Sequence, residues 1–193
     1  MKRFSNIIGF DDAPFPRHHT GDVAVVGAVF AALRFDGVLI GTVQKDGMDA
    51  AGRLVAMIRE SKFAQHIGLI MLQGVALAGF NVVDAPALSR NTNLPVLVVS
   101  RILPDMGAIQ AALLSGNIPG GSQKWAMIQA LGPMEPVNGI YVQRVGISRA
   151  QAEDVLTRFS IHSNIPEPVR TAHLIAGALT FHDRGFGESR GAP

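Results

Sequence analysis

The residues best suited to chemistry appear early in the chain, where a short apolar run over residues 5–10 ends in Asp11 and Asp12. A turn rich in proline follows at residues 13–16, so the run has the length and boundaries of a buried strand. A carboxylate at the end of a buried strand is costly to keep ionised unless a cation lies beside it. Its oxygens suit hard ions such as Mg²⁺ or Mn²⁺. The segment predicts a metal site with Asp11 or Asp12 as first ligand, and the alternative is a turn that begins with Asp.

Two further expectations concern the carboxylates around this predicted site. Adjacent residues of a strand face opposite sides of a sheet, so one of Asp11 and Asp12 should face the site and the other should cap the turn. Asp46 comes just after the third predicted strand and could supply a second ligand if that strand lies beside the first. The alternative, which we favour, is an ordinary turn aspartate before Gly47.

The segment after a later predicted strand combines a glutamine with glycines. Gly74 and Gly79 would let the backbone approach a ligand closely. The segment lacks the Gly-Lys-Ser/Thr of a phosphate-binding loop, which excludes a nucleoside triphosphatase of that type. Gln73 lies at the end of the predicted strand, where a carboxylate would strongly indicate a metal site. Its neutral amide can accept a hydrogen bond or coordinate weakly, but it cannot neutralise a divalent ion.

A third candidate place lies in the last predicted helix. Arg170 and His173 are three residues apart, so they share one face of that helix beside its apolar stripe. An arginine next to an imidazole suits phosphate binding and general acid or base catalysis. The alternative for His173 is a structural histidine. The spacing of the histidines does not form a zinc site.

The elements that position these residues alternate between strands and helices after a β-rich start. Strands are expected over residues 22–33, 38–43, 67–72, 95–100 and 139–144. Helices are expected over residues 48–62, 82–90, 105–114, 125–131 and 148–159, and in a last segment that ends near residue 181. The second of these helices would have Asn81 as its N-cap, and the helix after Ser148 has a capping-box partner in Gln151.

A turn expected at Asp36-Gly37 makes the first three strands antiparallel. The pattern therefore predicts an α/β fold of the ribonuclease-H-like kind, a mixed sheet that opens with three antiparallel strands and is flanked by helices. An all-parallel Rossmann sheet does not fit this opening. We expect one domain over residues 1–183 and a flexible Gly/Arg-rich tail over residues 184–193.

Composition limits the classes of function. The chain has 193 residues, of which 48% are hydrophobic and 17% charged, as expected when strands are buried on both faces. No apolar stretch reaches the roughly 18 to 20 residues that span a bilayer, and no signal peptide precedes Asp11. The absence of cysteine excludes disulfides and thiolate chemistry, and we expect a cytoplasmic location. The sequence gives no sign of an obligate protein partner. A net charge of +2 permits nucleic-acid binding without demanding it.

Together these segments resemble a largely archaeal family that is related to endonuclease V and whose members have been named endonuclease dU. The matching stretches occur in order along nearly the whole chain: residues 8–15, 70–84, 94–99, 164–176 and 187–191. The resemblance implies a ribonuclease-H-like fold and nicking, dependent on Mg²⁺ or Mn²⁺, of DNA that carries a deaminated base. For this family that base would be deoxyuridine.

The resemblance also assigns roles residue by residue. Asp11 matches the metal-binding aspartate on the first strand of endonuclease V, and His173 matches the late acid or histidine of a Pro-Glu-Pro-x-Arg-x-Ala motif. Gln73 falls where endonuclease V has a catalytic aspartate. The glutamate that endonuclease V supplies between these positions has no counterpart here, and Asp46 is the substitute that we propose.

The leading hypothesis is thus a metal-dependent endonuclease in DNA repair. Asp11 would bind the metal, Gln73 would orient substrate or water, and His173 would contact the phosphate or move a proton. The residues expected to bind substrate or to lie near an extruded base are Asp12, Gly74, Gly79 and Arg170. One alternative is a nucleic-acid-binding protein whose cleavage is weakened or lost because Gln73 replaces an aspartate. Another is a small-molecule hydrolase or phosphatase on the same scaffold.

Overall fold

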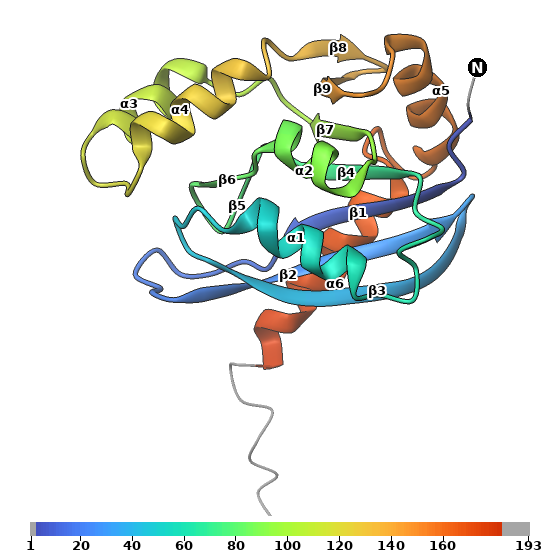
Figure 1. Cartoon of the computed structure of the whole chain (residues 1–193), viewed down its shortest axis with the longest axis horizontal. Helices are drawn as coiled ribbons and strands as arrows, with labels where there is room; N and C mark the ends of the chain where they lie inside the picture. The colour runs from blue at the N-terminus through green and yellow to red at the C-terminus, as the bar shows by residue number, and fades with distance from the viewer. Residues whose placement is uncertain (1–2, 183–193) are drawn as a thin grey trace, which may run out of the picture.

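A computed structural model describes residues 3–182 and builds them around a seven-stranded sheet, with strand order β3-β2-β1-β4-β7-β9-β8 (Figure 1). The strands are β1 (Asn6–Asp12), β2 (Asp22–Ala31), β3 (Arg34–Gln44), β4 (Leu69–Gln73), β7 (Val96–Ser100), β8 (Glu135–Val137) and β9 (Ile140–Val145). Strand β2 is antiparallel to both β1 and β3, and β4 and β7 run parallel to β1. Strand β9 is antiparallel to β7, and β8 is antiparallel to β9. The predicted mixed sheet with three antiparallel opening strands is confirmed.

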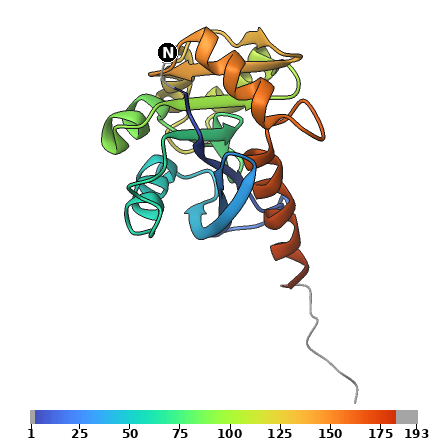
Figure 2. The same ribbon diagram turned by 90° about the vertical axis from the view of Figure 1, so that its right-hand side faces the viewer.

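Helices cover both faces of this sheet (Figure 2). They are α1 (Ala50–Arg59), α2 (Ala85–Thr92), α3 (Met106–Leu114), α4 (Gly121–Ala130), α5 (Arg149–Phe159) and α6 (Glu167–His182). One core lies between the sheet and the pair α1 and α2, and the other lies between the sheet and the pair α5 and α6. Helices α3 and α4 pack on each other near a two-stranded ribbon, β5 (Ala76–Leu77) and β6 (Asn81–Val82). No helix in the described part of the chain is long and apolar enough to cross a membrane.

Gly9 determines how closely α6 lies against β1. A Cβ atom added at Gly9 would come within 2.3 Å of the backbone carbon of Pro168, so any other residue would push the helix away. His173 comes five residues after Pro168, and five residues of helix advance about 7.5 Å. Asp11 comes two residues after Gly9, and two residues of strand advance a similar distance, about 6.6 Å. The close contact at Gly9 therefore brings His173 of the helix over Asp11 of the strand.

The hairpin between β2 and β3 turns earlier than predicted. The expected turn at Asp36-Gly37 is wrong, because the chain reverses at Ala32-Leu33, where Ala32 adopts a φ of +52°. Gly37 instead lies within β3 opposite Val29, and a Cβ there would come within 2.6 Å of the Phe63 ring. The glycine that looked like a turn signal provides room for an aromatic side chain.

The predicted helix start at Asn81 is also wrong. Asn81 belongs to β6, and α2 begins after Asp84, whose side chain accepts a hydrogen bond from the Ala87 N–H at 2.8 Å. The Asn81 side chain accepts instead from the Ala50 N–H at 3.1 Å, so it caps helix α1 from a distant part of the chain. Strand β8 was not expected, whereas the capping box at Ser148 and Gln151 is present as predicted. The predicted tail, residues 184–193, lies outside the described residues.

Candidate functional site

A carboxylate and an imidazole meet at the end of β1. Asp11 is 5% exposed, and its Oδ2 atom lies 2.7 Å from Nδ1 of His173 on α6. Burial raises the pKa of Asp11, while the hydrogen bond and the charge of His173 act in the opposite direction. The His173 side chain is otherwise exposed, so its Nε2 atom is available to a ligand or to solvent. The structure thus joins two of the residues that sequence reasoning placed in the site.

Gln73 lies beside this pair because β1 and β4 are parallel neighbours. Their register places Phe10 opposite Leu72, so Asp11 and Gln73 are level at the ends of adjacent strands. Met71 faces the α5/α6 core, and by alternation Gln73 points to the same side. An open pocket of about 420 Å³ forms there, and its polar lining comes from Gln73, Gly74, Ser100, Arg101, Arg170 and His173.

Glu167 holds one of the cations of this pocket in place. It is 8% exposed, and its carboxylate lies 3.3 Å from Nη1 of Arg170 and 3.0 Å from Nδ1 of His162. Sequence reasoning gave neither Glu167 nor Arg101 a role in the site. Arg101 could have been found, because it follows a predicted strand that ends at the same sheet edge as Gln73. The pocket therefore offers two guanidinium groups, which suit a phosphate.

Asp12 faces the opposite side of the sheet, as strand alternation predicts. Its Oδ2 atom accepts a hydrogen bond from the Ala78 N–H at 3.0 Å. Burial, and secondarily the charge of Asp11, raise the pKa of Asp12 to about 6. Asp12 is therefore a residue that holds the loop before β6, on the other side of β1 from the pocket that contains Gln73.

Asp46 lies in a turn after β3, as the favoured alternative predicted. Its Oδ1 atom accepts a hydrogen bond from the Phe80 N–H at 2.8 Å, and a Cβ at Gly79 would come within 2.5 Å of the same oxygen. Its backbone carbonyl accepts from Nζ of Lys124 at 2.6 Å. Asp46 and Gly79 thus contact each other, and neither lines the pocket that contains Gln73 and His173. The role of Asp46 as a metal ligand stays a prediction.

The donors at the site suit a sparsely coordinated metal ion. Within residues 3–182, no three His, Cys, Asp or Glu side chains gather closely enough to enclose one. The oxygens of Asp11, the Nε2 atom of His173 and the amide of Gln73 are the available groups. Mg²⁺ commonly takes only one or two protein carboxylates and completes its shell with water and substrate phosphate. The residues therefore fit an ion held by Asp11 and completed by a bound phosphate.

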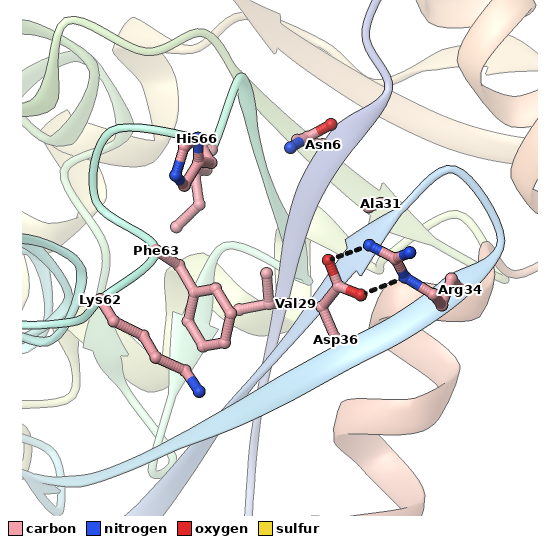
Figure 3. A pocket seen from close by; sticks show the side chains of 9 residues that line it. Asn6, Val29, Ala31, Arg34, Asp36, Lys62, Phe63 and His66 are labelled. Atoms are coloured by element: carbon pink, nitrogen blue, oxygen red, sulfur yellow. Dashed lines mark hydrogen bonds and ion pairs between the residues drawn. The ribbon is translucent and has the colours of Figure 1, made fainter.

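A separate pocket lies at the other end of β1 and contains none of these residues (Figure 3). Its most prominent polar pair is Arg34 and Asp36, joined by hydrogen bonds of 2.6 and 3.3 Å. Lys62 and His66 line its opposite side. Because the Asp36 carboxylate is already paired with a guanidinium, this pocket has no counterpart of the Asp11–His173 arrangement.

Solved structures with the same architecture identify the class of fold. Endonuclease V of Ciona intestinalis, in complex with a 24-mer DNA that contains an inosine followed by a ribo-adenosine, has a TM-score of 0.58 at 13% identity, covering 94% of this chain and 88% of that one. Endonuclease V of Bacillus subtilis has a TM-score of 0.60 at 12% identity, covering 93% and 83%. The protein therefore has a ribonuclease-H-like fold.

The family is more specific than the fold. The chain belongs to the endonuclease dU family, which it matches over residues 3–180. A UPF0215 protein of Deinococcus radiodurans is 50% identical over 92% of this chain and 90% of its own length. A crystal structure of a protein of unknown function from Archaeoglobus fulgidus has a TM-score of 0.83 at 34% identity, covering 90% of this chain and 97% of that one. The resemblance noted in the sequence is thereby confirmed.

Proposed function

We propose that this protein is a divalent-metal-dependent endonuclease that nicks DNA at deaminated bases, deoxyuridine foremost, in DNA repair. The observation that carries the proposal is the buried Asp11 carboxylate 2.7 Å from His173, at the edge of a pocket that also presents Arg170 and Arg101. Membership of the endonuclease dU family supports nuclease chemistry. The endonuclease V complex with inosine-containing DNA supports a nucleic-acid substrate with a deaminated base.

In this proposal, some groups of the site stabilise the charge of the phosphate, and His173 transfers a proton. A divalent ion bound at Asp11 would lower the pKa of a bound water and offset the charge of the phosphate. Arg170, fixed by Glu167, and Arg101 can donate hydrogen bonds to the phosphate oxygens. When Asp11 is ionised it favours the His173 tautomer with hydrogen on Nδ1, which leaves Nε2 free to accept a proton. Gln73 can orient substrate or water without adding charge.

Nicking of an end-labelled oligonucleotide with one deoxyuridine tests the proposal. The reaction should require Mn²⁺ or Mg²⁺, stop with a chelator, and fall about 10²–10⁴-fold in Asp11→Ala, since metal assistance is worth several kcal/mol. Asp36→Ala, which changes the carboxylate in the other pocket, is the control and should leave the rate unchanged. Divalent-dependent nicking that survives Asp11→Ala would overturn the assignment.

A DNA-binding protein with weakened or lost cleavage is the second candidate. Two observations favour it: Gln73 is neutral, and no three candidate ligands gather within residues 3–182. This alternative predicts salt-dependent DNA binding without any need for a divalent ion. The variant Gln73→Asp separates the two proposals. If it cuts deoxyuridine DNA and the wild type does not, the site is disabled at that one residue.

A further inference from the structure

A second cavity, of about 490 Å³, meets the candidate site at Gly74. Consecutive residues of the loop after β7 divide the two spaces, because Ile102 lines the site pocket and Leu103 lines this cavity. Its walls are mainly apolar and come from Val75, Leu103, Met106, Ile109, Ile128 and Met134. An apolar cavity next to a phosphate-binding pocket has the position and the character expected for a flat, uncharged ring.

One buried amide breaks the apolar lining. Gln143 on β9 is 4% exposed, and its Nε2 atom donates a hydrogen bond to the Gly132 carbonyl at 2.6 Å. A carbonyl can only accept, so this bond fixes which end of the amide is nitrogen and which is oxygen. The Oε1 atom has no hydrogen-bond partner among the described residues. Because Gln143 lines the cavity, a ligand that fills it would cover this oxygen. An acceptor covered without a donor costs free energy, which a ligand with a suitable N–H avoids.

Deamination creates the group that this acceptor requires. Cytosine has a ring nitrogen at position 3 that accepts hydrogen bonds, whereas uracil carries N–H at the same position. The change from adenine to hypoxanthine has the same effect at ring position 1. A fixed oxygen can therefore accept a hydrogen bond from the ring N–H of the deaminated base. It would be repelled by the lone pair on the same ring nitrogen of the undamaged base. Thymine shares the N–H of uracil, so this contact distinguishes uracil from cytosine and not from thymine.

We propose that this cavity receives the base extruded from DNA, and that Gln143 is the residue that selects a base with a ring N–H. The inference rests on the proposed function and names how its site would recognise damage. Enzymes that act at one base commonly take it out of the stack into such a pocket. Sites built to hydrogen-bond a substrate group reject analogues that lack it, because their own buried group is then left unpaired.

Binding without cleavage provides the test. Fluorescence anisotropy would compare single-stranded oligonucleotides with one uracil, N3-methyluracil or cytosine, in chelator and at moderate salt to weaken phosphate contacts. The wild type should prefer uracil by about tenfold. Gln143→Leu should reduce the preference to about twofold or less, with weaker binding of uracil. Gln129→Leu, an exposed glutamine on α4, is the control and should keep the full preference.

The outcomes separate this inference from the nuclease proposal. A preference for uracil that depends on Gln143, without nicking in Mn²⁺, supports base selection and contradicts the nuclease. Nicking with equal uracil preference in wild type and Gln143→Leu overturns the role of Gln143 and leaves the nuclease standing. If Gln143→Leu does not fold, Gln143→Met preserves the length of the side chain and serves instead. A wild type that binds uracil and N3-methyluracil equally also overturns the inference.

Discussion

Substituting Gly9 by alanine should damage the candidate site without touching any of its polar groups. The added Cβ would lie 2.3 Å from the Pro168 carbon, 2.5 Å from the Val169 nitrogen and 2.6 Å from the Pro168 oxygen. These atoms are backbone, so no side chain can rotate away, and α6 has to move by about 1 Å to reach ordinary contact. Overpacking of this kind costs about 1–3 kcal/mol.

The movement should affect chemistry more than stability. The bond from Asp11 to His173 spans 2.7 Å, and a shift of about 1 Å takes it beyond hydrogen-bond distance. Misplacement by about 1 Å can cost about 10²-fold in rate. Urea denaturation would measure the stability, and single-turnover nicking of deoxyuridine DNA would measure the rate.

The matched control is Gly52→Ala on α1, where an added Cβ meets nothing within 4 Å. That variant should be neutral or stabilised by about 0.5–1 kcal/mol, because alanine is the better helix former. If Gly9→Ala keeps both the stability and the rate of the wild type, the account of how α6 is placed is wrong.

Three further predictions follow from other contacts. Mn²⁺ at ten times its dissociation constant should stabilise the wild type by about 1.4 kcal/mol, a rise of about 3–6 °C in thermal midpoint, and the rise should be absent in Asp11→Asn. Asn81→Ala should lower the free energy of unfolding by about 2–4 kcal/mol in urea titrations, because the Ala50 N–H and the Gln44 carbonyl lose their buried partner; a loss below 1 kcal/mol would contradict that capping role. Glu167→Gln should weaken DNA binding in anisotropy titrations by several-fold, because Arg170 loses its buried carboxylate; unchanged affinity would show that Arg170 does not depend on it.

Much of the fold could be predicted because apolar runs and their boundaries are local signals. β1 and the capping box at Ser148 were found in this way. The hairpin turn was missed because Ala32 carries no turn signal, whereas the glycine of Asp36-Gly37 serves packing against Phe63. The helix start was misplaced because Asn81 caps a helix that lies 31 residues earlier in the chain. Contacts of that range leave no pattern in the local sequence.

The candidate site was partly predictable for a similar reason. Asp11 and Gln73 end adjacent strands, and His173 lies on the helix that covers them, so topology alone brings them together. Strand alternation also predicted that one of Asp11 and Asp12 would face away from the site, although it did not say which. The amide of Gln143 was not predictable, because its role depends on the carbonyl of Gly132 and on a cavity that residues from four separate stretches of the chain line.

A double-mutant cycle on Asp11 and His173 tests the central claim most directly. Single-turnover nicking of deoxyuridine DNA in Mn²⁺ would be measured for the wild type, Asp11→Ala, His173→Ala and the double variant. If the two side chains act as one unit, each single variant should lose most of the rate and the double variant should lose little more. A rate loss in the double variant equal to the product of the two single losses would contradict the account. A His173→Ala rate equal to that of the wild type would also contradict it.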